Sequence, residues 1–353
     1  MQNESIEFGF LSIFALLTFF IFLIINNFSY KFNNGILLDK DFLKPQAFHK
    51  EAISRSGGIA SIISLILFFL IYYLLFSKIL YEYIFICTSL FFLGYLDDIK
   101  IKINPNIRLF LMIVFLIIFI NILPVRIYNI DLIFLNLWLE NIFFSTIFIL
   151  LCFLFIINGA NLIDGFNGLL AINLIIINSI LLFININNGQ SEFSVFLSAQ
   201  IIILVSFLFF NFPKAKIFFG DSGSYLMGAL VALNTIYTNN LNPNLSSFFF
   251  CIVLFYLFFE VFFSFVRKTV QKKSPVLPDN LHLHMLSYKK IRQIFGTEKS
   301  NYINSIVINT IYAFLVVPSI YYADNSLICK YWFFSLILIY TLVYFRLYRL
   351  TKN

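Results

Sequence analysis

Charged residues are scarce in this sequence. Asp, Glu, Lys and Arg make up 12% of its 353 residues, about half the share of a water-soluble domain, whereas 61% of the residues are apolar. Only four cysteines are present, and no two of them show metal-ligand spacing or suggest a disulfide framework. These scarcities exclude an ordinary soluble domain. No internal repeat or low-complexity linker is apparent.

Long, almost uncharged runs fill most of the chain instead. Runs of about 17 to 21 residues are long enough to cross a bilayer as helices. They lie at about 8–25, 58–76, 79–96, 107–123, 142–157, 165–184, 195–212, 222–238, 246–266, 302–322 and 330–345. The pattern predicts an all-α polytopic membrane protein with about 11 (10–11) transmembrane helices in a single domain, 1–353. The first seven residues hold two acids and no Lys or Arg, unlike a cleavable signal peptide.

The basic residues are divided unequally between the two sets of connections. Of the 24 Lys and Arg residues, 21 fall on one set, and only Lys78, Arg126 and Lys330 fall on the other. The positive-inside rule then predicts an outside N-terminus and a cytoplasmic C-terminus. The net charge of +7 is therefore better explained by anionic lipid headgroups than by nucleic acid.

Four polar clusters interrupt the apolar sequence, all on the predicted inside face, where acids are retained mainly for coordination or catalysis. The adjacent carboxylates Asp97 and Asp98 end the third run. They point about 100° apart on a helix, and oxygen ligands with open positions suit Mg²⁺ bridging a diphosphate. A solvated helix end is the alternative for this pair alone.

The second cluster combines amides, an acid and glycines. Asn158, Asn161 and Asp164 recur every three residues, and Gly165 and Gly168 permit tight turns or close approach of a ligand to the backbone. A polar turn between two spans is the alternative. A purely structural turn needs only one or two such residues, so we favour function.

Asp221 lies among small residues in Gly-Asp-Ser-Gly-Ser at the start of the eighth run. Backbone donors and hydroxyls at a helix N-terminus suit phosphate, and the carboxylate suits a metal ion. Alone, this segment is better explained as a helix cap. Beside the other acidic clusters, we favour a site.

The fourth cluster, in the loop 267–301, contains Asp279, His282 and His284. Its histidine spacing suits two imidazoles around a phosphate in an extended, exposed segment better than one helical metal site. A basic interfacial loop is the alternative. For Glu260, within the ninth run, we favour snorkelling to the interface or pairing with Arg267.

Taken together and in this order, the motifs resemble those of the polyprenyl-phosphate N-acetylhexosamine-1-phosphate transferase family, glycosyltransferase family 4. The matching segments cover much of residues 55–284. They are Arg55-Ser-Gly-Gly, Gly94-Tyr-Leu-Asp-Asp, Asn158-Gly-Ala-Asn-Leu-Ile-Asp-Gly-Phe-Asn-Gly-Leu, Phe219-Gly-Asp-Ser-Gly-Ser and Pro278-Asp-Asn-Leu-His-Leu-His.

The resemblance implies transfer of a sugar-1-phosphate from a UDP-sugar to undecaprenyl phosphate, with UMP released, at a cytoplasmic cleft in the bacterial inner membrane. It implies Mg²⁺, with Mn²⁺ as an alternative, and membrane lipid and a second copy of the chain as partners. By position it implies catalytic roles for Asp97, Asp98, His282 and His284 and metal binding by Asp221 and Asp164. It implies substrate binding by the remaining matched residues, Lys50, Arg55, Asn158, Asn161 and Asp279.

Two departures from the family pattern help to decide which branch of the family the sequence resembles. Asn167 stands where the family has a second Asp, and the loop lacks the three consecutive histidines of the muramoyl-pentapeptide transferases of peptidoglycan synthesis. The loop is similar to that of the branch that starts O-antigen, capsule or related surface glycans with N-acetylglucosamine-1-phosphate. The rival interpretations are a peptidoglycan transferase and a membrane transporter, although transporters place polar residues near the bilayer midplane.

Overall fold

Helices dominate the computed structural model. It describes residues 2–31, 35–39, 52–99, 101, 103–123, 125–128, 130–274, 277 and 279–352, without the side chains of residues 2–8 and 298. The α-helices are α1 (Gln2–Ser29), α2 (Gly57–Phe76), α3 (Tyr81–Asp98), α4 (Pro105–Ile122), α5 (Ile133–Leu139), α6 (Ile142–Ile163), α7 (Leu169–Asn187), α8 (Ser191–Asn211), α9 (Gly220–Leu241), α10 (Ser247–Val253), α11 (Phe255–Val270), α12 (Leu283–Val316) and α13 (Ser326–Lys352).

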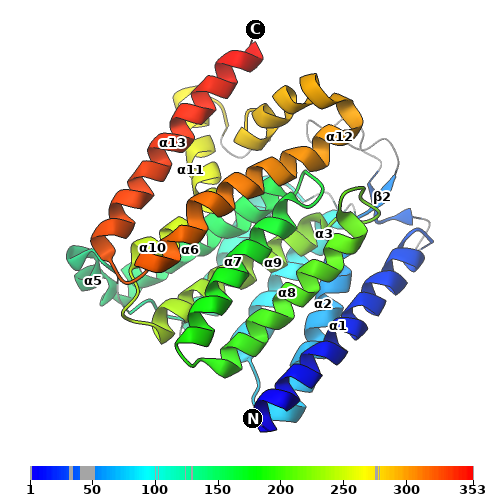
Figure 1. Cartoon of the computed structure of the whole chain (residues 1–353), viewed down its shortest axis with the longest axis vertical. Helices are drawn as coiled ribbons and strands as arrows, with labels where there is room; N and C mark the ends of the chain where they lie inside the picture. The colour runs from blue at the N-terminus through cyan, green and yellow to red at the C-terminus, as the bar shows by residue number, and fades with distance from the viewer. Residues whose placement is uncertain are drawn as a thin grey trace.

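The remaining regular elements are short. A 3₁₀ helix, η2 (Val317–Tyr322), joins α12 to α13. The strands β1 (Leu38–Asp39) and β2 (Ile53–Ser54) pair antiparallel, with Leu38 opposite Ser54. The start of α13 and the start of α1 lie at the same end of the bundle, while the C-terminus lies at the opposite end from the N-terminus (Figure 1).

The helices confirm an all-α polytopic membrane protein. All eleven predicted runs overlap helices. Within the described residues, eight helices are long and apolar enough to cross a membrane, and the bent pair α10 and α11 makes a ninth candidate. The helices of the two remaining predicted runs, α3 and α9, are too polar to be counted as candidate spans. α3 carries three acids, and α9 is rich in amides and hydroxyls. The predicted count of eleven is therefore not confirmed.

The most polar of these helices is also the most enclosed. α9 is buried along almost its whole length and packs against α3, α6, α7 and α2. Outer helices such as α1 and α13 instead expose large apolar side chains, including Leu16 and Leu338. Apolar groups on the outside and polar groups within are the arrangement that lipid favours.

Buried amides join α9 to its neighbours. Asn234 of α9 donates to Asn178 of α7 (3.1 Å) and to the side-chain oxygen of Gln200 of α8 (2.8 Å), and it accepts from the Tyr83 hydroxyl of α3 (3.1 Å). One turn further on, Asn185 of α7 donates to Thr238 (2.9 Å). Such contacts satisfy polar groups that lipid cannot, and they fix the helices relative to one another.

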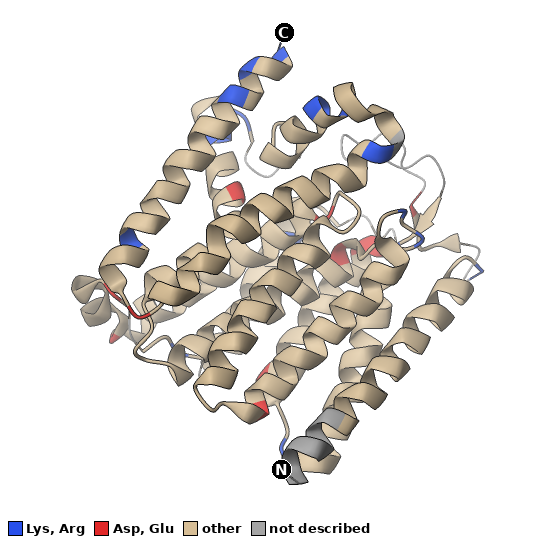
Figure 2. Ribbon diagram, in the orientation of Figure 1, with Lys and Arg blue, Asp and Glu red and all other residues tan. Residues whose placement is uncertain are grey.

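Basic residues gather at the end of the bundle where α13 ends, and few lie at the other end (Figure 2). The β1–β2 pair lies at this basic end, where Phe218 N–H donates to the Ser54 carbonyl (2.8 Å) and Gly57 N–H donates to the Phe218 carbonyl (2.9 Å). These bonds tie the start of α2 to the segment that enters α9, and thereby place Arg55 beside the start of α9.

Candidate active site

Asp98, the last residue of α3, is 1% exposed and lies under the N-terminus of α9. Its carboxylate accepts hydrogen bonds from the backbone N–H groups of Asp221 (3.0 Å) and Ser222 (3.0 Å) and from the Ser222 hydroxyl (2.6 Å). The helix's own N-cap residue, Phe219, makes no side-chain cap. Asp98 therefore satisfies backbone donors that an N-cap normally satisfies, and its negative charge suits this end of the helix.

Close packing of α3 on α9 depends on two glycines. A Cβ on Gly94 would lie 2.4 Å from the Asp221 carbonyl, and one on Gly220, whose φ is +72°, would lie 2.6 Å from both Asp98 carboxylate oxygens. A positive φ is also strained for other residues. The Gly-Tyr-Leu-Asp-Asp and Gly-Asp-Ser-Gly segments thus pack directly against each other, where the end of α3 meets the start of α9.

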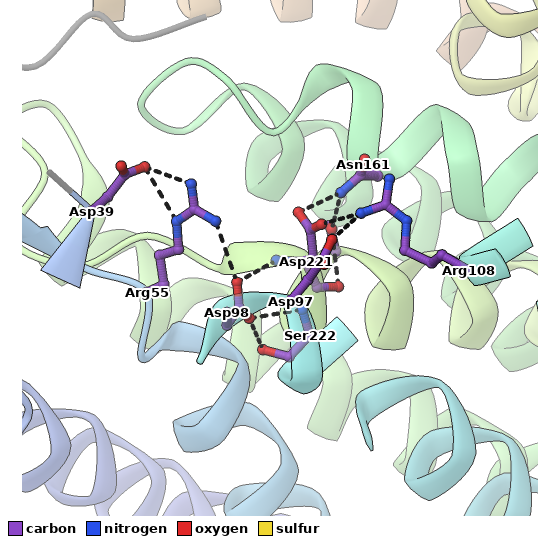
Figure 3. Close-up of polar contacts among 9 residues, drawn as sticks. Asp39, Arg55, Asp97, Asp98, Arg108, Asn161, Asp221 and Ser222 are labelled. Atoms are coloured by element: carbon purple, nitrogen blue, oxygen red, sulfur yellow. Dashed lines mark hydrogen bonds and ion pairs between the residues drawn. The ribbon is translucent and has the colours of Figure 1, made fainter. Parts of the chain in front are cut away.

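Asp97 and Asp221 face a common cation. Arg108, in the first turn of α4, donates through Nη1 to Asp97 and to Asp221 Oδ2 (2.9 Å) (Figure 3). The Asp97 and Asp221 side chains are 19% and 24% exposed, whereas that of Asp98 is 0% exposed. We call Asp97, Asp98 and Asp221 the acidic cluster. Its two partly exposed members are open to a ligand.

Asn161 completes this side of the cluster from α6. Its Nδ2 donates to Asp221 Oδ1 (3.0 Å) and to Ser224 Oγ (3.0 Å) (Figure 3). Asn158, three residues earlier, donates instead to the Leu154 carbonyl of its own helix (2.7 Å). The structure therefore brings Asn161, but not Asn158, into contact with the acidic cluster.

Arg55 lies on the other side of Asp98. Its guanidinium binds Asp39 of β1 (2.6 Å) and has Nη1 3.7 Å from Asp98 Oδ1 (Figure 3). Burial would lower the pKa of Arg55, but the charges of Asp39 and Asp98 raise it above its ordinary value, so the group stays cationic. Lys50, the other predicted phosphate contact, lies outside the described residues.

Asp164, the first residue after α6, is half-buried, and among the described residues no hydrogen bond or ion pair reaches its carboxylate. Burial, and then the charges of Asp221 and Asp98, raise its pKa well above the ordinary value. Additional positive charge near Asp164 would therefore be favourable.

The carboxylates of this site supply part of the ligand set that Mg²⁺ needs. No three His, Cys, Asp or Glu side chains within the described ranges are arranged to hold a metal by themselves. Mg²⁺, however, is commonly held by one or two carboxylates together with substrate phosphates. Asp97 and Asp221 already converge on the Arg108 cation, and Asp164 supplies a further carboxylate. These residues fit an ion that a phosphorylated ligand completes.

The two histidines lie in the protein interior rather than in an exposed segment. His282 is the N-cap of α12 and is 3% exposed, and His284 is 0% exposed. His282 Nδ1 lies 3.1 Å from Glu260 Oε1, and its Nε2 lies 3.2 Å from Asp279 Oδ1. Our prediction of an exposed histidine loop was wrong, because the buried Glu260 and the partly exposed Asp279 fix His282.

Glu260 of α11 is likewise buried and does not pair with Arg267. Besides lying near His282, its carboxylate accepts from Leu283 N–H (3.0 Å) and the Tyr340 hydroxyl of α13 (2.7 Å). Arg267 instead binds Asp279 (2.7 Å), and this pairing lowers the pKa of Asp279 although burial opposes it. The prediction of a snorkelling Glu260, or one paired with Arg267, was therefore wrong. Glu260, His282, His284 and Tyr340 are called the histidine group below.

His284 links the histidine group to the loop after α6. Its ring stacks parallel to that of His282 (5.5 Å between centroids) and packs edge-on against Phe166, two residues beyond Asp164 (5.7 Å). Burial lowers the pKa of His284 to about 3, and no described residue forms a hydrogen bond with its Nε2. Asn167 secures the same loop by donating from its backbone to Asn301 (2.7 Å) and from its side chain to the Pro213 carbonyl (2.9 Å).

Arg108, Ser222 and Tyr340 belong to these sites but were not predicted. Arg108 begins an apolar run on the basic side, where an interfacial cation needs no special explanation. Tyr340 lies within an apolar run far along the chain from Glu260. The sequence offered a usable signal only for Ser222, which follows Asp221 directly.

The middle of the chain is similar to known proteins. Residues 80–239, which include Asp97, Asp98, Arg108, Asn161, Asp164 and Asp221, match the model of glycosyl transferase family 4. Over these residues, which are less than half of the chain, the protein is similar to this family. Arg55 and the histidine group lie outside the matched residues.

Several relatives of known name share the middle of the chain. It is 32% identical over 139 residues to the undecaprenyl-phosphate alpha-N-acetylglucosaminyl 1-phosphate transferase of Thermotoga maritima. The aligned residues make up 39% of this chain and 42% of that protein. It is 29% identical over 143 residues to the phospho-N-acetylmuramoyl-pentapeptide-transferase of Clostridioides difficile (40% and 44%). A probable undecaprenyl-phosphate N-acetylglucosaminyl 1-phosphate transferase of Bacillus subtilis is 31% identical over 133 residues (36% of each). The chain thus spans less than half the length of these relatives.

Proposed function

We propose that this protein transfers a sugar-1-phosphate, an N-acetylhexosamine-1-phosphate, from a UDP-sugar to undecaprenyl phosphate and releases UMP. The observation that carries the proposal is the convergence of Asp97, Asp221, Asn161 and Arg108 at one end of the bundle. These side chains come from four helices of the segment that matches glycosyl transferase family 4.

The reaction joins two anions. An oxygen of the lipid phosphate forms a bond to the sugar-linked phosphorus, the bond from that phosphorus to the bridging oxygen breaks, and UMP leaves with the electron pair. Asp97, partly exposed beside Arg108, accepts the proton of the lipid phosphate. Arg108 and Arg55 offset the negative charge, and Asn161 orients Asp221. We favour this direct attack over prior formation of a covalent intermediate on an Asp.

Asp98 takes a positioning role in this proposal, because its carboxylate is enclosed by the start of α9. Mg²⁺ would be held by Asp221 with Asp164 nearby, and it would neutralise phosphate charge and orient the two substrates. Mn²⁺ could replace it.

The histidine group suits the sugar-nucleotide side of the site. Arg267 and Lys268, the neighbours of Asp279, supply positive charge there. We favour a donor of the N-acetylglucosamine type over the muramoyl-pentapeptide, since the loop lacks three consecutive histidines. Relatives of both names occur, so both donors belong in the test.

We place the acidic cluster on the cytoplasmic side of the bacterial inner membrane, with the N-terminus outside. The support is the gathering of Lys and Arg at the same end of the bundle (Figure 2). A reporter fused after Asn353 should be active only in the cytoplasm. A periplasmic signal would invert this arrangement and remove the carboxylates from cytoplasmic nucleotide.

The activity is tested by supplying purified protein with undecaprenyl phosphate and a panel of UDP-sugars that includes UDP-N-acetylglucosamine and UDP-N-acetylmuramoyl-pentapeptide. We expect UMP release that requires both substrates and a divalent ion. Release with the pentapeptide donor alone would move the protein to the peptidoglycan branch. Absence of release with every donor, together with substrate flux into vesicles, would favour a transporter.

A further inference from the structure

Tyr225 of α9 lies next to the acidic cluster. It follows Asp221 by four residues, so the two side chains lie on the same face of α9, about one turn apart. Tyr225 is 1% exposed and is the bulkiest of the fully enclosed side chains in the described part of the chain. Among the buried residues of α9, a helix that the structure describes from end to end, it alone is aromatic. A large ring is therefore enclosed beside the charged groups.

The guanidinium of Arg108 lies over the ring of Tyr225. Its Cζ is 5.7 Å from the ring centroid, within the range of a cation–π contact. The same guanidinium donates through Nη1 to Asp97 and to Asp221 Oδ2 (2.9 Å). Arg108 extends from the first turn of α4, so these contacts with α3 and α9 hold a long side chain away from its own helix.

The contacts that hold Arg108 differ in kind. Two are ion pairs with partly exposed carboxylates, and the third is a contact with a neutral ring. In the proposed reaction Asp97 takes up a proton and Asp221 binds a metal ion, so both carboxylates then attract Arg108 less strongly. The ring binds neither a proton nor Mg²⁺, which prefers oxygen ligands, and its contact with the guanidinium persists.

We propose that Tyr225 is a positioning residue that keeps the Arg108 guanidinium beside the acidic cluster while the carboxylates act on other groups. The inference rests on the proposed function and adds to it the support for the cation that offsets phosphate charge. An arginine side chain loses conformational entropy when it is ordered, and the ring provides part of that order before the substrates bind.

Two substitutions of Tyr225 separate this role from the filling of space. Tyr225→Phe keeps the ring, whereas Tyr225→Leu keeps an apolar side chain and removes the ring. Phe119→Leu is the matched control, because Phe119 belongs to α4 like Arg108 and is 1% exposed. Its ring packs edge-on against that of Phe153 (5.8 Å between centroids) and lies 11 residues along α4 from Arg108.

Steady-state kinetics of UMP release test the role. We expect Tyr225→Leu to lower kcat/KM about 10-fold, the scale of a cation–π contact removed from water. Tyr225→Phe and Phe119→Leu should stay within about 2-fold. Tyr225→Met, which is also apolar and has no ring, should behave as Tyr225→Leu and serves if that variant does not fold.

A double variant shows whether Tyr225 acts through Arg108. In an Arg108→Gln protein, Tyr225→Leu should cause little further loss, because the group that the ring supports has been removed. A full further loss in that background would overturn the inference. An equal loss in Tyr225→Leu and Phe119→Leu would overturn it as well, since any buried ring would then have the same effect.

Chemical labelling separates failure of this inference from failure of the proposed function. Phenylglyoxal modifies arginine, and peptide mass spectrometry measures its rate at Arg108 in the full-length protein without substrates. We expect modification of Arg108 about 5-fold faster in Tyr225→Leu than in the wild type, and unchanged in Tyr225→Phe and Phe119→Leu. Arg55, which Asp39 binds, is the internal reference and should react equally in all.

The labelling result stands whether or not UMP is released. Equal rates at Arg108 in the wild type and Tyr225→Leu would overturn the inference. A selective rise at Arg108 in a protein that releases no UMP from any donor would support the contact and contradict only the proposed function.

Discussion

The Asp98 carboxylate accepts the Ser222 hydroxyl at 2.6 Å across 124 positions of sequence. With two further bonds from the backbone at the start of α9, it joins the end of α3 to the beginning of α9. Two neighbouring acids therefore have different surroundings: Asp98 is enclosed by backbone donors, and Asp97 faces Arg108. We therefore expect mutation of Asp98 to affect mainly stability and mutation of Asp97 to affect mainly activity.

Asp98→Ala should destabilise the protein more than Asp97→Ala. It leaves buried N–H groups and a hydroxyl without an acceptor, which costs about 1–3 kcal/mol for each such group. Thermal unfolding in detergent measures the difference. Ser222→Ala, which removes only one bond, should fall between Asp98→Ala and the wild type. An Asp98→Ala protein as stable as Asp97→Ala would contradict the capping role.

Asp97→Asn and Asp221→Asn should each lower UMP release by at least about 100-fold, because each removes a charged base or ligand without changing size. The assay uses equal amounts of each variant at saturating Mg²⁺. Asn167→Asp is the control, since the Asn167 side chain bonds the Pro213 carbonyl rather than the acidic cluster, and it should retain activity. Full activity with unchanged Mg²⁺ dependence in Asp221→Asn would leave that residue as a helix-capping element only.

Asn158 and Asn161 provide a matched pair one helical turn apart. Asn161→Ala removes the amide that binds Asp221 and Ser224, so we expect about a 10-fold loss of kcat/KM, the effect of one good hydrogen bond to a charged group. Asn158→Ala removes a bond to its own helix and a weak contact with the Met112 sulfur, but no bond to the acidic cluster, and should stay within about 2-fold. Steady-state kinetics decide. Equal losses would mean that Asn158 reaches the substrate.

Glu260→Gln should weaken activity through His282 rather than by direct contact. The glutamine keeps the size of the side chain but replaces one acceptor oxygen with a donor in a group where His282, Leu283 and Tyr340 meet. We expect losses of about 10-fold or more for Glu260→Gln and for His282→Ala, and a double variant little worse than either, because residues in one network are not additive. Additive losses would show that the two residues act separately. Tyr340→Phe should mimic Glu260→Gln in part.

Acid should destabilise the protein through His284. Its pKa in the folded state is about 3, below the ordinary value of about 6.5, so the unfolded chain binds a proton between these values that the folded chain does not. The contribution of neutral His284 to stability is complete above pH 6.5 and declines as the pH falls towards 3. Unfolding measured across this range should be less pH-dependent in His284→Gln than in the wild type. Parallel curves would exclude a buried neutral imidazole.

Apolar runs predicted the helices well because lipid requires long apolar segments, and the residues around them predicted where the acids gather. They could not predict the bend in 246–266, where α10 and α11 meet at 78°. No Pro or Gly lies at this point, so the bend depends on tertiary packing. One such packing contact is that of Gly159 of α6 with the Leu257 backbone near the start of α11.

The sequence pointed to several residues that the structure brings together, but it did not give Arg108 or the contacts between them. The sequence identified Asp97, Asp221 and Asn161, yet it could not distinguish Asn158 from Asn161, because only the position of α9 decides which amide meets Asp221. The histidines were expected at the surface because their partners are distant in the sequence. Glu260 lies 22 positions from His282, and Tyr340 lies 80 positions from Glu260. Such partners are found only once the helices are packed.

The buried amides around Asn234 fix the position of α9 along its own axis. A slide of α9 by one helical turn, about 5.4 Å, would unpair Asn234 from Asn178, Gln200 and Tyr83 together. Asp221 begins the same helix, so its distance from the membrane surface is set by contacts several turns away. The carboxylate is held at a fixed level, so in the proposed reaction the lipid phosphate and the nucleotide must move to it.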